Sequence, residues 1–184
     1  MLYLDLVVLG NGVYEQSLTE VAQALILLAM VACYLRLAAR KPEYRSTYVL
    51  IAGFFACMLV REMDFYLDEL WFPLALAVTL VCCWQAWRRR EQALGGLVYF
   101  CRSRSFGVVL SGIVTLLVFS RLLGMKILWQ ALLGDQYVKV LKNAIEEGTE
   151  QFGYLLCLIG TVWHAFIARR DRGRHVIAAQ NFQA

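Results

Sequence analysis

The chain has 184 residues, of which 60% are hydrophobic and 17% are charged, and its formal net charge is +4. Soluble domains are about 45–50% apolar, so this composition favours an integral membrane protein and argues against a soluble one. The sequence contains only two prolines and no stretch rich in glycine, serine or proline, which excludes an obvious linker. We therefore expect one membrane domain over residues 1–184.

The N-terminal part predicts an interfacial segment followed by a spanning helix. Residues 1–16 are apolar but too short to cross a bilayer, and they lack the basic start and cleavage site of a signal peptide. Ser17 and Glu20 have the spacing of a capping box, which predicts that the first spanning helix begins there. This helix is expected to run to about Leu37.

Four more apolar stretches predict spanning helices, the first of which continues from its apolar run into charged residues after Val60. They cover residues 46–60, 71–87, 106–132 and 138–170, and the basic residues 171–184 are expected to form a tail. The connections between the stretches are short, so we expect an all-α bundle of about five transmembrane helices. Extramembrane loops of this size leave no room for a separate catalytic domain.

The distribution of basic residues predicts the orientation of this bundle. Of the 18 Lys and Arg residues, 13 lie in the connections 36–45 and 88–104 or after residue 167, all on one side. Three lie on the other side, and Arg61 and Arg121 fall within spans. The positive-inside rule then places the N-terminus outside and the C-terminus in the cytoplasm. The expected location is a membrane that follows this rule, such as the bacterial inner membrane.

The six cysteines show no spacing typical of a metal site. No Cys-x-x-Cys motif and no paired Cys/His motif is present. The cysteines fall in apolar segments or close to basic ends, so they are expected to remain free thiols that pack as small hydrophobic groups.

Charged residues recur at one depth of the predicted bundle. Measured from the basic cytoplasmic ends, four charges on different helices lie 16 to 19 residues inward, which is about 24–29 Å in a helix. That depth is close to the outer edge of a hydrocarbon core about 30 Å thick. Arg61 and Arg121 are expected to pair there with carboxylates. The predicted polar layer consists of Glu20, Arg61, Glu62, Asp64, Arg121, Glu146 and Glu150.

Three interpretations of this polar layer remain open. It can be a salt-bridge clamp that sets the register of the bundle, or a pathway for a cation or proton. It can also be a chemical site in which a carboxylate acts as acid or base. Glu146, Glu147 and Glu150 are candidate ligands for a hard cation such as magnesium, calcium or manganese, but no Glu-x-x-His pair supports them. No cofactor can be assigned.

The histidines and the small residues suggest helix packing. His164 is expected to be a packing residue of the last helix, and no serine with a histidine partner can be recognised. Gly107, Ser111 and Thr115 recur every four residues in the fourth predicted span. Together with Gly153 in the fifth, such small residues suit close packing of these two helices or a symmetric contact between protomers.

These features predict a non-enzymatic membrane component, such as a sensor, an assembly factor or an ion-conducting subunit. The alternative is a membrane-embedded enzyme or transporter that uses Glu and Asp carboxylates on a lipid or ion. The expected partners are membrane lipids and further copies of the chain or other subunits of a complex. The basic runs suit anionic headgroups at a membrane surface, and no nucleic-acid partner is expected.

Overall fold

The computed structural model describes residues 18–134 and 137–181, with side chains described up to residue 170. Of the residues in these ranges, 93% are in helices and none is in a strand. The predicted interfacial segment 1–16 and the capping residue Ser17 lie outside the described residues. The helical class predicted from the sequence is confirmed.

The described residues form a succession of long and short helices. Their bounds are α1 (Leu18–Arg40), η2 (Pro42–Tyr44), α2 (Arg45–Glu62), α3 (Asp64–Leu67), η3 (Asp68–Leu70), α4 (Trp71–Arg88), α5 (Arg90–Cys101), α6 (Phe106–Val114), the π-helical η4 (Thr115–Phe119), α7 (Ser120–Gly124), α8 (Lys126–Leu133) and α9 (Lys139–Asn181).

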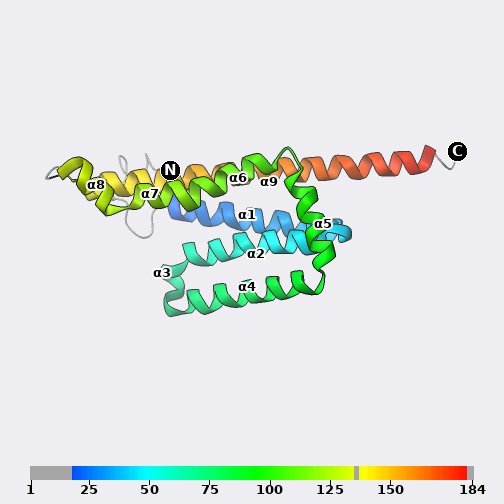
Figure 1. Cartoon of the computed structure of the whole chain (residues 1–184), viewed down its shortest axis with the longest axis horizontal. Coiled ribbons are helices and arrows are strands. Elements are labelled where there is room, and N and C mark those ends of the chain that lie inside the picture. Colours follow the sequence, from blue (N-terminus) through cyan, green and yellow to red (C-terminus); the bar gives the residue numbers. More distant parts are fainter. Residues whose placement is uncertain (1–17, 135–136, 182–184) are drawn as a thin grey trace.

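The long helices lie side by side in a row (Figure 1). Helix α4 packs on α2, α2 on α1, α1 on α9, and α9 on the continuous stretch from α6 to α7. Helix α5 crosses one end of this row, and α3, α7 and α8 lie at the other end. We call these the α5 end and the Glu150 end, the latter after the residue of α9 at which the candidate site described below is centred.

Five helical stretches are long and apolar enough to cross a membrane, as predicted. They are Thr19–Arg40, Pro42–Glu62, Asp64–Arg88, Phe106–Gly124 and Lys139–Arg170. The second stretch begins at a proline, which has a fixed backbone angle suited to the first turn of a helix. The third stretch has no buried residue in its most apolar window, so α4 exposes apolar side chains on the outside of the row.

Helix α5 was not predicted, because residues 88–104 were interpreted as a basic connection. The helix is held on α2 and η2 by specific contacts. The Thr47 hydroxyl of α2 donates to the carbonyl of Ala93 over 2.9 Å, and Tyr99 stacks on Tyr44 of η2 at a centroid distance of 4.5 Å. The ammonium group of Lys41 lies 5.2 Å from the Tyr99 ring centre, within cation–π range. These contacts fix α5 across the end of the row.

The predicted fourth span, 106–132, is wrong at its C-terminal end. Met125 has an extended backbone with φ of −70° and ψ of 114°, which ends α7 and starts the separate helix α8. Before this break, η4 is a π-helical insertion between α6 and α7, and such insertions often accompany functional positions. Ser120, the first residue of α7, is fully buried.

The core is aromatic and lies between α1, α2 and α9. Tyr34, Tyr48, Phe55 and Tyr154 are at most 1% exposed, and Tyr34 stacks on Phe55 with a centroid distance of 5.8 Å. Pairs of this geometry contribute about 0.5–1.5 kcal/mol beyond the burial of their area. The phenolic groups also need hydrogen-bond partners when buried, which places polar contacts inside the row.

Helices α6 and α9 approach each other closely through glycines. A Cβ added at Gly112 would lie 2.7 Å from the carbonyl oxygen of Gly153 and 2.8 Å from the backbone nitrogen of Cys157. A Cβ added at Gly160 would lie 2.9 Å from the backbone nitrogen of Val109. The small residues of α9 therefore serve packing within one chain. Helix α9 then continues through most of the predicted tail, to Asn181.

Candidate functional site

The site centres on Glu150 of α9, whose side chain is 9% exposed. Its Oε1 atom accepts a hydrogen bond of 2.6 Å from the Ser120 hydroxyl. The same oxygen lies 3.6 Å from Nη2 of Arg121 and 4.0 Å from Nη2 of Arg61. One carboxylate oxygen thus joins α9 to α7 and to the end of α2.

Glu62 extends the site from α2 toward α9. Its side chain is 11% exposed, and its Oε1 atom accepts a hydrogen bond of 3.1 Å from Arg61. The Tyr154 hydroxyl, one helical turn after Glu150, donates to the same oxygen over 2.6 Å. We call these six residues the Glu150 cluster: Arg61, Glu62, Ser120, Arg121, Glu150 and Tyr154.

The burial of these side chains decides which contacts contribute most. The side chains of Arg61 and Arg121 are 39% and 51% exposed, so their ion pairs are screened and weak. The hydroxyl bonds to Glu150 and Glu62 are short and shielded, and a hydrogen bond to a charged group contributes about 1.5–3 kcal/mol. The two hydroxyls, more than the two arginines, therefore stabilise the cluster.

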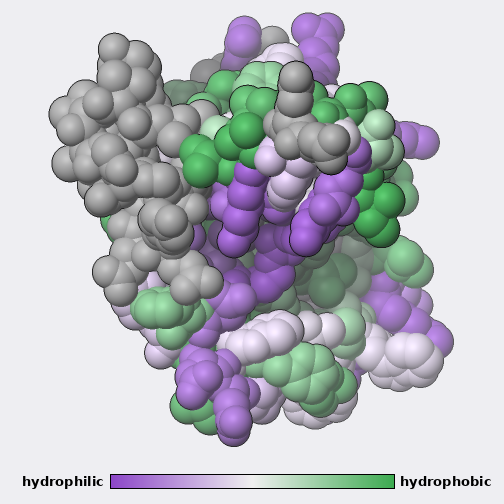
Figure 2. All heavy atoms as spheres, turned by 90° about the vertical axis from the view of Figure 1, so that its left-hand side faces the viewer, coloured by the Kyte–Doolittle hydropathy of each residue, from purple (hydrophilic) through white to green (hydrophobic). Residues whose placement is uncertain are grey.

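The cluster lies at the Glu150 end of the row, away from α5. Figure 2 looks onto this end and shows hydrophilic groups gathered in its middle, with hydrophobic groups around them. Arg61 and Glu62 are the last residues of α2, and Ser120 and Arg121 begin α7. Water can therefore reach the arginines from this end, while both carboxylates remain largely covered.

Three of the predicted polar-layer residues lie apart from the cluster. Asp64 accepts a hydrogen bond of 2.7 Å from the backbone N–H of Phe65 at an exposed position. Glu146 pairs with Lys142 at 2.7 Å and packs against Gly124. Glu20 of α1 has an interaction partner, and its carboxyl group is close enough to that of Glu147 for the two to interact electrostatically. The other four predicted residues, Arg61, Glu62, Arg121 and Glu150, come together.

Two residues of the cluster were missed by sequence reasoning. Ser120 precedes Arg121, and Tyr154 is four residues after Glu150, so helical spacing places both near predicted charges. A search restricted to charged side chains passes over both hydroxyls. Their proximity to predicted charges was the signal that could have found them.

A second acidic group lies beside the cluster, between α1 and α9. Gln23 is fully buried, and its Nε2 donates to Oε2 of Glu147 at 3.4 Å. The Oε1 atom of Gln23 accepts no hydrogen bond from the described residues. A buried acceptor without a donor costs about 1–3 kcal/mol, so this position favours an added hydrogen-bond donor.

The candidate metal ligands do not converge. Glu146 forms an ion pair with Lys142, and Glu147 accepts a hydrogen bond from Gln23. Glu150 accepts a hydrogen bond from Ser120 and pairs with Arg121. Within residues 18–134 and 137–181, no group of three His, Cys, Asp or Glu side chains is arranged to hold a metal ion. The three glutamate side chains therefore contact different neighbours.

A separate polar cluster surrounds His164 nearer the α5 end. His164 is fully buried, and its Nε2 lies 3.1 Å from the hydroxyl of Tyr48, while its Nδ1 lies 3.1 Å from that of Ser105. The rings of Phe100 and His164 pack edge to face, with their centroids 4.8 Å apart. The expectation that no serine would have a histidine partner was therefore wrong. The pairing could not be recognised in the sequence, because Ser105 is 59 residues away from His164.

This pairing suits packing better than nucleophilic catalysis. Ser105 and His164 are both fully buried, so no substrate reaches the hydroxyl. Both ring nitrogens are engaged, and the Ser105 hydroxyl also lies 2.9 Å from that of Ser103. The cluster satisfies polar groups where α2, α9 and the connection to α6 meet.

Comparison with family models, with curated proteins and with solved structures found no match for this chain.

Proposed function

We propose that the protein is a non-enzymatic integral membrane component with its N-terminus outside and its C-terminus in the cytoplasm. Five span-capable helices support insertion, and the strong bias of Lys and Arg toward the α5 end supports the orientation. In this orientation the Glu150 cluster lies toward the outer leaflet. A bacterial inner membrane fits the same charge rule.

The observation that carries this proposal is the convergence on Glu150. Ser120 and Arg121 reach its Oε1 from α7, and Arg61 reaches it from α2. Each charge already has a partner from the protein, so the cluster needs no ligand to be stable. Its role is then that of a clamp that holds the outer ends of α2, α7 and α9 in register.

The exposed face of α6 supports assembly with further subunits. On α6, Gly107 and Ser111 are exposed, and a Cβ added at Gly107 would meet no atom within 4 Å. This stripe of small residues faces away from α9 and suits close contact with another helix. We therefore propose a homo-oligomer or a subunit of a larger complex, with the clamp fixing the shape of each protomer.

Native mass spectrometry of the complex, released gently from membranes, tests this proposal. Wild type is expected to show a defined stoichiometry above one and no bound metal. Glu150→Gln is expected to lower the yield of that complex, while Glu91→Gln, an exposed carboxylate on α5, leaves it unchanged. A metal retained by wild type and lost in Glu150→Gln, or a monomer throughout, overturns the proposal.

A second candidate, a transporter or enzyme site for a cation or proton, is favoured by the buried acceptor of Gln23. The carboxyl groups of Glu147 and Glu20 lie near the same place. Flux of protons or monovalent cations into vesicles containing the purified protein tests it. Flux lost in Glu147→Gln but kept in Glu69→Gln, a matched carboxylate near the start of α4, would support this candidate over the clamp.

A further inference from the structure

A groove between α1 and α9 lies close to the α5 end. It has a volume of about 290 Å³, and its walls come from both helices. The lining includes Ala29, Ala32 and Ala165, and Arg36, Arg40 and Arg169. Small apolar side chains line one part of the groove, and arginines line the other.

The order of residues along α1 gives the groove a direction. Ala29 and Ala32 lie on the side of the bilayer interior, and Arg36 and Arg40 follow toward the cytoplasmic end. From Ala29 to Arg40 the helix rises about 16 Å. A ligand that fills the groove must therefore be amphipathic, with an apolar part beside the alanines and a negative group beside the arginines.

The arginines are available for such a ligand. Arg36, Arg40 and Arg169 are exposed, and none of them forms an ion pair with a side chain that the structure describes. They come from two helices that run in the same direction, toward the α5 end of the row (Figure 1). A guanidinium group forms strong paired hydrogen bonds with phosphate oxygens.

We infer that this groove binds an anionic phospholipid of the inner leaflet, with the phosphate at the three arginines and an acyl chain along Ala29, Ala32 and Ala165. Basic pockets between transmembrane helices on the cytoplasmic side take such headgroups. A soluble anion would meet only the basic half of the groove, whereas a phospholipid fills both. The inference rests on the membrane orientation of the proposed function and not on the Glu150 clamp.

Lipid retention in native mass spectrometry tests the inference. The protein is reconstituted in nanodiscs of phosphatidylglycerol and phosphatidylcholine in equal amounts, released, and scored for each lipid that stays bound. Wild type is expected to retain phosphatidylglycerol preferentially. Each basic residue at an anionic surface strengthens attraction about fivefold, so Arg36→Gln with Arg169→Gln should reduce that preference by about 25-fold.

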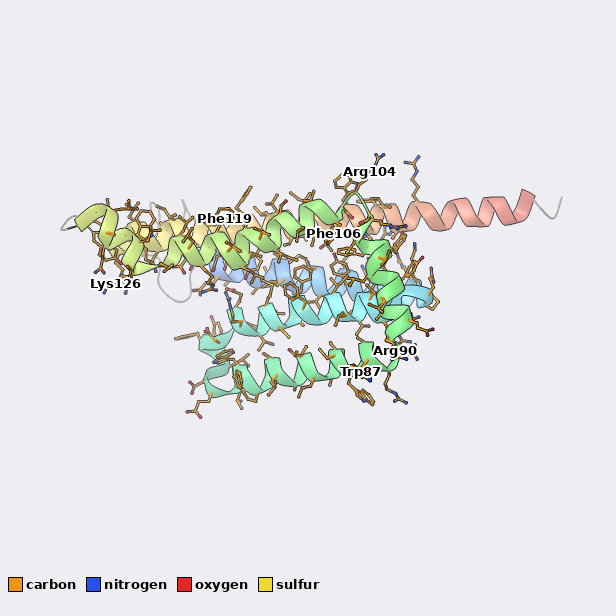
Figure 3. The ribbon with its side chains drawn as sticks, viewed as in Figure 1. Trp87, Arg90, Arg104, Phe106, Phe119 and Lys126 are labelled. Carbon is orange, nitrogen blue, oxygen red and sulfur yellow. The ribbon has the colours of Figure 1, made fainter. Side chains whose placement is uncertain are left out.

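A matched control removes two basic residues from the same end but outside the groove. Arg90 and Arg104 lie at the α5 end without lining the groove (Figure 3). Arg90→Gln with Arg104→Gln should therefore keep the preference of wild type. An equal loss in both double variants, or equal retention of both lipids by wild type, overturns the inference.

A variant that changes shape without changing charge provides an independent test. Ala32 is exposed in the groove, so Ala32→Trp fills the apolar half while leaving all three arginines in place. Retention of phosphatidylglycerol should fall as in the arginine variant, with an unchanged unfolding midpoint. If Ala32→Trp retains the lipid as wild type does, the arginines attract lipid only as a charged surface and the groove is not a binding site.

Discussion

Tyr154 of α9 donates its phenolic hydrogen to Glu62 at the end of α2 across 2.6 Å, although 92 residues separate them in sequence. This bond lies one helical turn from Glu150 and links the helices on the two sides of α1. It is the most direct polar connection between α2 and α9 at this end.

Removing this hydroxyl should destabilise the fold measurably. Tyr154→Phe leaves Glu62 with Arg61 alone, and we expect a loss of about 1–2 kcal/mol in the free energy of unfolding, which is typical of buried bonds between membrane helices. Unfolding by sodium dodecyl sulfate in bicelles measures this loss. Tyr66→Phe is the control, because Tyr66 is 64% exposed; equal effects would contradict a role for the bond.

The close approach of α6 and α9 predicts a strong difference between Gly112 of α6 and Gly95 of α5. Gly112→Ala forces a methyl group against the backbone of α9, whereas a Cβ added at Gly95 meets no atom within 4 Å. Overpacking of this kind costs about 1–3 kcal/mol. Thermal unfolding should therefore show a lower midpoint for Gly112→Ala and no lowering for Gly95→Ala. Similar midpoints would mean that α6 and α9 are not in contact at Gly112.

The stability of the protein should depend on how many residues of the His164 cluster are substituted together. His164→Leu leaves the buried Tyr48 hydroxyl without this partner, at about 1–3 kcal/mol for an unsatisfied group, and leaves the Ser105 hydroxyl with Ser103. Adding Tyr48→Phe and Ser105→Ala removes those hydroxyls, so the triple variant should be more stable than His164→Leu alone. A triple variant that unfolds more easily than the single one would argue against a packing role.

The proposed orientation predicts which positions are accessible from outside the cell. Lys126 begins α8 at the Glu150 end, and Arg104 lies at the opposite end (Figure 3). A membrane-impermeant maleimide should add one label to Lys126→Cys in intact cells and none to Arg104→Cys until the membrane is opened. The mass of the labelled protein, compared with wild type, counts the labels. The reverse pattern would invert the topology.

Periodicity and length were sufficient to predict the long helices, because a span requires an apolar run that is hard to mistake. They failed at helix α5, whose 12 residues are too few to span and lie in a basic connection. They also failed at Met125, where the chain turns extended with no proline to mark the break. Both errors concern short elements, whose structure depends on what they pack against.

The depth of charges was sufficient to predict that Arg61, Arg121 and Glu150 lie near one another. It could not predict their partners, because Ser120 and Tyr154 are neutral and the pairing depends on how the helices rotate. The same reason explains the Ser105–His164 contact, which joins residues on different elements. The spacing of residues along one helix does not show which face of a second helix packs against it.

The measurement that tests the clamp most directly is a double-mutant cycle on Ser120 and Glu150, which form the more buried of the two 2.6 Å hydrogen bonds of the cluster. The free energy of unfolding in bicelles is compared for wild type, Ser120→Ala, Glu150→Leu and the double variant. We expect the two substitutions to be coupled by about 1–2 kcal/mol, because Ser120→Ala costs little once its acceptor is gone. Effects that add within about 0.3 kcal/mol would contradict the clamp.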